Sequence, residues 1–91
     1  MSAKVHCAHI LVKTETEAKN VKVRLEKGEK FGAVAQQVSR CSSAKKGGDL
    51  GTLTRGKTVK EFENAAFKLQ KGEISSPVKT QFGYHIIKRL E

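Results

Sequence analysis

The stretch CSSAKKGGDLGTLTRG, residues 41–56, divides the chain and organises the segments around it. Four of the eight glycines lie in it, and this density of glycine indicates positive φ angles or a close approach of two backbones. It separates two segments of helical periodicity, and its residues 50–54 have the composition of a short strand. A polar, tightly turned segment inside a small domain is a favourable place for a site, although the same pattern is typical of a plain surface loop.

Before this stretch, residues 4–12 are predicted to form a strand. Alternation with a period of two gives the strand two faces, Val5, Cys7, His9 and Leu11 on one and His6, Ala8, Ile10 and Val12 on the other. Because both faces are mostly apolar, the strand is expected to be central in its sheet. His9 then lies at a covered face, where a core histidine with a hydrogen-bond partner is the simplest interpretation.

Three helices are predicted from their apolar stripes. The first starts at a capping box, Thr14 with Glu17, and runs to about Lys27. The second spans about residues 31–40, and the third starts at a second capping box and runs to about residue 69. That second capping box consists of Thr58 and Glu61. Residues 41–46 can add one short helical turn.

Two further strands are predicted after the third helix, over residues 74–79 and 84–90. The first of them is assigned to a sheet edge because Pro77, the single proline, has no N–H to donate to a ladder. The order of elements indicates a single α+β domain, residues 1–91, with one small sheet partly covered by helices.

Composition narrows the function classes. No apolar run approaches the roughly 18–20 residues that span a bilayer, and the N-terminus lacks the apolar region of a signal peptide. Two cysteines make no disulfide framework, so both thiols are expected to be free in a reducing, cytoplasmic setting.

The net charge of +9 suits acidic partners such as nucleic acid or anionic lipid, or simply a solubilising surface. Five aromatic residues without interleaved basic runs argue against nucleic-acid binding as the main function.

Three polarisable side chains, His9, Cys41 and His85, are the candidates for chemistry. A Cys/His pair is typical of thiol proteases and transferases, but Cys41 lies in no known nucleophile motif and the chain leaves little room for a cleft. A zinc site is not expected, because no C-x-x-C spacing occurs and a strand would place His6 away from Cys7 and His9. The glycine-rich segment also lacks the lysine and hydroxyl residue of a phosphate loop.

Several segments resemble the parvulins, a family of small peptidyl-prolyl cis/trans isomerases. They are H-I-L-V at 9–12, F-x-x-V-A at 31–35, S-x-C-S-S-A-K-K-G-G-D-L-G at 39–51, R-G at 55–56, F-E-x-A-x-F at 62–67, G-E-I-S-x-P-V at 72–78 and F-G-Y-H-I-I at 82–87. The resemblance covers nearly the whole chain in the family's order. It implies a four-stranded antiparallel sheet surrounded by four helices, in the order β-α-α-α-β-α-β-β, with the turn after Cys41 as the short third helix.

The resemblance also implies the site residues. The two histidines of the family fall on His9 and His85, which are expected to form a hydrogen-bonded pair, and the central Cys or Asp position falls on Cys41. The pocket for the substrate proline falls on four residues, Leu50, Thr58 and Phe62 with Phe82 at the rim. Thr58 is a departure, because that position is commonly Met, and a smaller, more polar wall puts the affinity for proline in doubt.

The implied function is the isomerisation of Xaa-Pro bonds in unfolded or flexible segments of client proteins, without metal or cofactor and by a monomer. Parvulins that prefer phospho-Ser/Thr-Pro carry a basic loop after the first strand. Here residues 13–17, KTETE, have one lysine and two acids, so no phosphate requirement is expected. The residue before proline is instead expected to be apolar or basic. The alternative is a non-catalytic module that binds proline peptides and is tethered to polyanionic surfaces, including the inner membrane surface.

Overall fold

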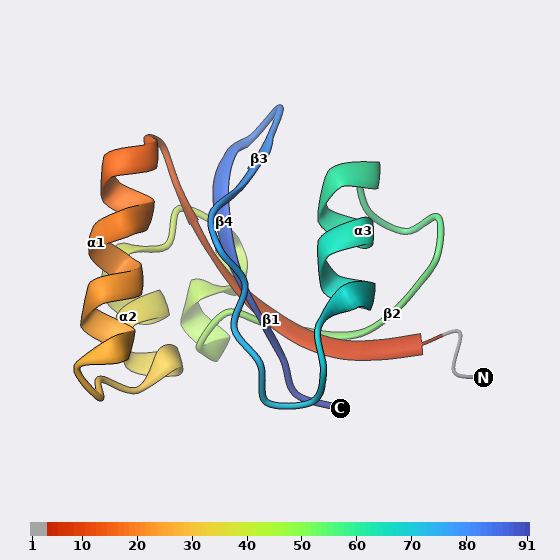
Figure 1. Ribbon diagram of the computed structural model, residues 1–91, viewed down its shortest axis with the longest axis horizontal. Coiled ribbons are helices and arrows are strands. Elements are labelled where there is room, and N and C mark those ends of the chain that lie inside the picture. Colours follow the sequence, from red (N-terminus) through yellow and green to blue (C-terminus); the bar gives the residue numbers. More distant parts are fainter. Residues whose placement is uncertain (1–3) are drawn as a thin grey trace.

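The computed structural model describes residues 4–91 and shows one antiparallel sheet between two layers of helices (Figure 1). The strand order is β2-β1-β4-β3, and the strands are β1 (Lys4–Val12), β2 (Asp49–Thr54), β3 (Val78–Thr80) and β4 (Gly83–Arg89). The helices are α1 (Glu15–Glu26), α2 (Phe31–Val38), the 3-10 helix η1 (Ser42–Lys46) and α3 (Lys60–Lys68). In Figure 1, α1 and α2 lie on one side of β1 and β4, and α3 lies on the other. The α+β class, the element order and the antiparallel sheet are therefore confirmed. Residues 1–3, part of the N-terminus that lacks the apolar region of a signal peptide, lie outside the described residues.

The central strand β1 separates two hydrophobic clusters, as its alternation predicts. It pairs with β2 along one edge and with β4 along the other. Its even-numbered residues Ala8, Ile10 and Val12 pack into the cluster under α1 and α2. Its odd-numbered residues Val5 and Cys7 pack with Phe62 and Ala66 of α3. Each face of the sheet therefore has its own core, and His9 lies on the α3 side.

The glycine-rich stretch lets two backbones meet. Gly48 has a φ of 83°, and a Cβ atom at this position would collide with the carbonyl oxygen of His9. In place of that clash, the His9 N–H donates to the Gly48 carbonyl at 2.9 Å. The pairing of β1 with β2 shifts register at the same point, between Cys7 and Ala8. Glycine at 48 therefore sets the backbone position of His9.

The local signals differ in their outcome. The Thr14 hydroxyl accepts from the Glu17 N–H at 3.2 Å, so the first capping box is confirmed. The second is wrong, because α3 begins at Lys60 with Val59 as its N-cap and no side-chain cap bond. Thr58 lies one residue too early to cap this helix, and its side chain lines a groove instead.

The predicted strand over residues 74–79 is shorter than expected, although its edge position is confirmed. Regular pairing is limited to Val78–Thr80, with one isolated bridge between Ile74 and Lys88. Between them Ser75 replaces part of the ladder, because its hydroxyl accepts from the Ile87 N–H at 2.9 Å and its own N–H donates to the Ile87 carbonyl at 2.8 Å. Pro77, without an N–H, cannot extend this pairing. Within residues 4–91, no helix has the length and apolar character that crossing a membrane requires.

Candidate active site

A groove of about 410 Å³ opens on the α3 side of the sheet. All seven residues assigned to the site by the resemblance line it, namely His9, Cys41, Leu50, Thr58, Phe62, Phe82 and His85. They come from β1, the turn before η1, β2, the β2–α3 loop, α3, the β3–β4 turn and β4. Segments far apart in sequence thus converge on one hollow. Phe82 lies at its edge, and 60% of the surface of this residue is exposed.

The two histidines form the floor of the groove and bond to each other. His9 Nδ1 lies 2.9 Å from His85 Nδ1, and the two rings are stacked with an interplanar angle of 20°. Both residues are buried. The predicted hydrogen-bonded pair is therefore present.

A chain of hydrogen bonds connects the histidine pair to Thr80. The Thr80 hydroxyl accepts from the Phe82 N–H at 3.1 Å and lies 2.7 Å from His85 Nε2. When this hydroxyl donates to Nε2, His85 carries its proton on Nδ1 and donates to His9 Nδ1; when it accepts from Nε2–H, the bond between the two rings runs the other way. His9 Nε2 is a buried atom without a partner in the described chain. The chain links the rim of the groove at Phe82 to its floor at His9.

Both imidazoles are neutral at physiological pH. Burial lowers the pKa of His85 to about 4. Burial, followed by the proximity of His85, lowers the pKa of His9 to about 4. Protonating both rings would also place two N–H groups opposite each other across a 2.9 Å contact. The floor therefore presents an uncharged surface.

Phe62 holds the pair from the side of α3. Its ring lies edge-to-face with His9 at a centroid distance of 5.5 Å and with His85 at 5.2 Å. Phe62 is 3% exposed, so it belongs both to the core under α3 and to the wall of the groove. Such contacts add about 0.5–1.5 kcal/mol each beyond the area that they bury.

The two cysteines have different surroundings. Cys7 is fully buried, and burial, with a smaller effect of Asp49, raises the pKa of its thiol to about 11. Cys41 is half-buried at the groove, just before η1, and its N–H donates to the Ser39 hydroxyl at 3.4 Å. In the part of the chain that the structure describes, no hydrogen bond joins its sulfur to a base. Cys41 thus lines the groove without the adjacent general base that activates a thiol nucleophile.

The loop between β2 and α3 is fastened to α3 by Glu63. The Glu63 carboxylate accepts from Arg55 Nη1 at 3.0 Å and from the Gly56 N–H at 2.5 Å, and these bonds, the Gly56 bond first, lower its pKa. The Arg55 guanidinium lies 4.4 Å above the centre of the Phe67 ring. This arrangement fixes the loop that carries Lys57 and Thr58 to the groove.

Sequence reasoning missed four residues of the site. Leu11, Lys57 and Val59 also line the groove, and Thr80 bonds His85. The alternation of β1 already places Leu11 on the face of His9. Lys57 and Val59 adjoin Thr58, but no local pattern points to Thr80. Among residues 4–91, no three His, Cys, Asp or Glu side chains come together as a metal site would require.

Comparisons with known proteins agree with this geometry. The family model of the rotamase, PPIC-type PPIase domain matches residues 9–91. The foldase protein PrsA of Geobacillus kaustophilus is 57% identical over 86 residues, which are 93% of this chain and 31% of that protein. The chain thus spans about a third of the length of the curated relatives that it matches.

Solved structures extend the comparison to the fold. The crystal structure of PrsA from Bacillus subtilis superposes with a TM-score of 0.95 and 51% identity, over 98% of this chain and 35% of that one. The solution structure of NmPin, the parvulin of Nitrosopumilus maritimus, superposes with a TM-score of 0.90 and 54% identity, over 100% of this chain and 99% of that one. The chain therefore belongs to the PPIC-type PPIase family of rotamases, the parvulins.

Proposed function

We propose that the groove on the α3 side catalyses cis/trans isomerisation of Xaa-Pro bonds in flexible segments of client polypeptides. The observation that carries this proposal is an apolar groove above a neutral, hydrogen-bonded histidine pair. Membership in the family supports the same reaction.

The groove suits the physics of the reaction. Amide resonance places a barrier of about 18–20 kcal/mol between cis and trans, and uncatalysed exchange takes tens to hundreds of seconds. The transition state is a twisted amide that has lost this resonance and is less polar than the planar form. Leu50, Thr58 and Phe62 can hold the proline ring while the rest of the peptide rotates. Excluding water from the bond removes solvation that favours the planar amide.

The residues at the floor act by position. The His9–His85 pair holds Phe62 and keeps charge out of the groove, while Cys41 stands at the wall. Rotation about the amide breaks no covalent bond in this scheme, so no nucleophile is needed. Cys41 then tunes the polarity of the wall.

Exchange spectroscopy on an Ala-Leu-Pro-type peptide tests the proposal. We expect cis/trans exchange to accelerate in proportion to the protein concentration. The matched variant Thr58→Met restores the side chain common in the family. It is expected to lower KM because methionine adds apolar surface to the wall of the pocket. No acceleration at high protein concentration, for either protein, would sink the proposal.

Tethering to polyanions is the second candidate function, and the net charge of +9 is what supports it. We infer weak association of a monomeric domain with anionic surfaces, at about 1 kcal/mol for each lysine near the surface. The Nζ of Lys22 donates to the carbonyls of Ile74 and Ser75, which fixes its position and leaves its charge. Co-sedimentation with anionic vesicles but not neutral ones, lost on raising the salt concentration, would support this function. Equal binding to both vesicles, or none at low salt, would reject it.

A further inference from the structure

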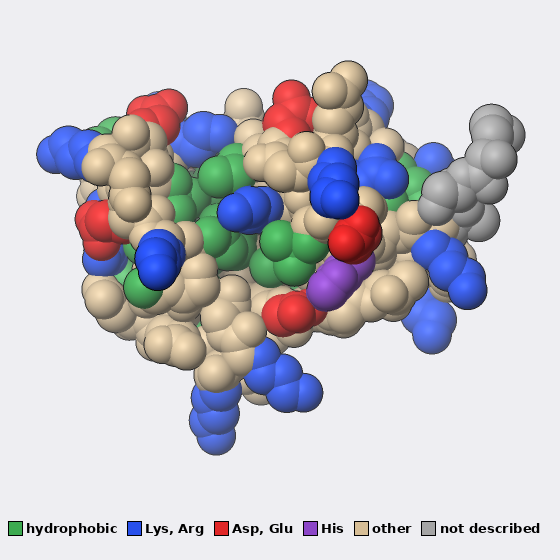
Figure 2. Space-filling view, turned by 90° about the horizontal axis from the view of Figure 1, so that it is seen from below, with side chains coloured by type: hydrophobic (Ala, Val, Ile, Leu, Met, Phe, Trp, Pro, Cys, Tyr) green, Lys and Arg blue, Asp and Glu red, His purple; other side chains and the backbone are tan. Residues whose placement is uncertain are grey.

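A second hollow lies on the opposite side of the sheet, under α1 and α2. It has a volume of about 590 Å³ and adjoins a smaller one of about 330 Å³, since Leu25 and Ile74 line both. We call the two together the trough. Figure 2 shows hydrophobic side chains at the bottom of a hollow, with Lys or Arg, Asp or Glu, and a His side chain around it. None of the residues of the candidate active site lines the trough.

The floor of the trough is apolar. Leu25, Ile74 and Leu90 are half-buried against the core under α1 and α2, with Phe31 and Ala8 beneath them. Three large side chains from α1, the segment before β3 and the C-terminal residues thus leave apolar surface open in the trough. Covering it with apolar side chains of a ligand would remove that surface from water.

One end of the trough gathers lysines. Lys30 precedes α2 and Lys46 ends η1, and the two segments meet through Gly32 and Gly47. A Cβ at Gly47 would lie 3.1 Å from the Cα of Gly32, closer than side-chain contacts normally come, so this approach requires glycine. Lys88 of β4 completes the group.

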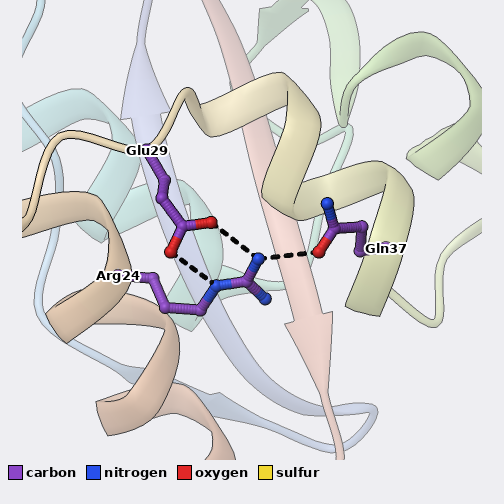
Figure 3. A network of polar contacts seen from close by, with 3 residues as sticks. All are labelled: Arg24, Glu29 and Gln37. Carbon is purple, nitrogen blue, oxygen red and sulfur yellow. Dashed lines mark hydrogen bonds and ion pairs between the residues drawn. The ribbon is translucent and has the colours of Figure 1, made fainter.

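Two carboxylates, Glu29 and Asp49, also line this end of the trough. Glu29 accepts from Arg24 Nε at 3.0 Å and from Arg24 Nη2 at 2.7 Å, and the same guanidinium bonds Gln37 (Figure 3). Asp49 is bonded by His6 Nε2 at 2.8 Å and by the Gly51 N–H at 2.7 Å. Within residues 4–91, Lys30, Lys46 and Lys88 have no ion-pair partner, and Lys88 is half-buried. The lining of the trough thus has four lysines, Lys22 included, against three carboxylates, Glu26 included. Because Arg24 balances the charge of Glu29, the trough keeps a net positive charge beside apolar surface.

We propose that the trough binds an extended polypeptide segment in which acidic residues accompany large apolar ones. The apolar side chains lie on Leu25, Ile74 and Leu90, and the carboxylates pair with Lys30, Lys46 and Lys88. The recessed apolar floor with lysines beside it suits a chain segment that carries both kinds of side chain. A flat lipid surface would reach the lysines at the edge without filling the recessed floor. This site is separate from the isomerase groove and does not depend on the activity proposed there.

Fluorescence anisotropy with labelled, proline-free peptides tests the proposal, since such peptides offer no Xaa-Pro bond to the other groove. A peptide alternating glutamate with leucine is expected to bind. Peptides alternating lysine with leucine, or glutamate with serine, are expected to bind at least about tenfold more weakly, a difference of about 1.4 kcal/mol. Backbone amide shifts of the full chain should move at Gly28, Gly32 and Leu90 and not at Phe82.

Variants separate the two parts of the site. We expect the double charge reversal Lys30→Glu with Lys46→Glu to lower the affinity for the glutamate–leucine peptide by about tenfold or more. We expect the same loss of affinity from Leu90→Ala alone. Lys60→Glu and Lys68→Glu together, an equal double reversal at exposed positions of α3, are the control and should change the affinity less than twofold beyond the effect of net charge. Circular dichroism checks that each variant folds, and the surface lysine variants keep the test open if Leu90→Ala does not.

Three outcomes would overturn the proposal. Equal affinity for the glutamate–serine peptide would reduce the trough to a general polyanion patch. Anionic vesicles that compete fully with the peptide, together with an unchanged affinity in Leu90→Ala, would assign the lysines to a membrane surface. Amide shifts confined to the residues of the isomerase groove would place the peptide there.

Discussion

The two faces of the sheet use the same strand in opposite ways. On the α1–α2 side, the buried residues that β1 contributes to the core are apolar, Ala8, Ile10 and Val12, and polar groups stay at the edge of the trough. On the α3 side, the same strand contributes His9, and a buried chain of polar groups runs through His85 to Thr80. The first face is a conventional core with charge around its rim. The second has polarity at its centre and apolar surface at its opening.

This difference shows that the buried polar groups of the candidate site, on the α3 side, cost folding stability. Burial lowers the pKa of His9 to about 4, so that its ring stays neutral. One buried nitrogen of His9 also has no partner in the described chain. Such features cost free energy and persist where the surrounding packing enforces them. Phe62, in edge-to-face contact with both rings, supplies that packing. Mutations on the two faces should therefore separate stability from activity.

The largest separation is expected between Phe62→Ala and Phe31→Ala. Both remove a buried phenyl ring, at 3% and 7% exposure, and each should cost about 3–5 kcal/mol of unfolding free energy. Only Phe62→Ala should also lower kcat/KM by about a hundredfold or more, or about 2.7 kcal/mol, because only Phe62 touches the histidine pair and the groove. Denaturant titration and exchange spectroscopy on the folded fraction measure the two effects. Similar activity losses in both variants would abolish the distinction between the faces.

Acid should destabilise the α3 face before it affects the other. The pKa of His9 and His85 is about 4 in the folded chain and near 6.5 when unfolded, so the unfolded state binds more protons between these values. Stability is therefore complete above about pH 6.5 and is lost as the pH falls toward about 4, by a few kcal/mol. Carboxylates with a lowered pKa, such as Glu63, also stabilise the folded chain. They lose this contribution only as the pH falls below their ordinary value of 4.5.

Urea unfolding at about pH 6.5 and about pH 5 isolates the histidine contribution. The control His6→Gln removes the third histidine, which is partly exposed and bonded to Asp49, and should keep the drop. A pH-independent stability over this range would mean that the pair titrates alike in both states.

The sequence was informative wherever a pattern was local or strongly periodic. The alternation of β1 was sufficient to place His9 on a covered face, and the Thr14 capping box marked the true start of α1. The capping pattern at Thr58 failed because the groove, a tertiary feature, uses that side chain. The bond from Thr80 to His85 likewise depends on the register between β3 and β4, which no local pattern encodes. The resemblance placed all seven site residues at one groove, while their individual roles stay predictions.

Cys41 lies where the α3 face meets the glycine-rich stretch, and a moderate effect is expected there. Cys41→Asp should keep kcat/KM within about tenfold of the original chain, because the side chain is half-buried at the wall and no base adjoins its sulfur. Phe62→Ala, measured in the same assay, sets the scale of a true site loss. Near-complete loss in Cys41→Asp with an unchanged circular dichroism spectrum would favour a covalent role for the thiol.

The smallest effect is expected from phosphate on the substrate. The loop after β1 offers one exposed lysine, Lys13, and its Thr14 is committed to capping α1, so no clamp of several cations can form there. One other lysine, Lys57, reaches the groove, and within residues 4–91 it has no ion-pair partner. A single exposed cation contributes at most about 1 kcal/mol, roughly fivefold in kcat/KM. Matched Ser-Pro and phospho-Ser-Pro peptides should therefore differ by no more than that, and Lys57→Gln should erase most of the difference. A preference of about a hundredfold for the phosphopeptide, or about 2.7 kcal/mol, would require several cations converging on the phosphate and would contradict the site described for the α3 face.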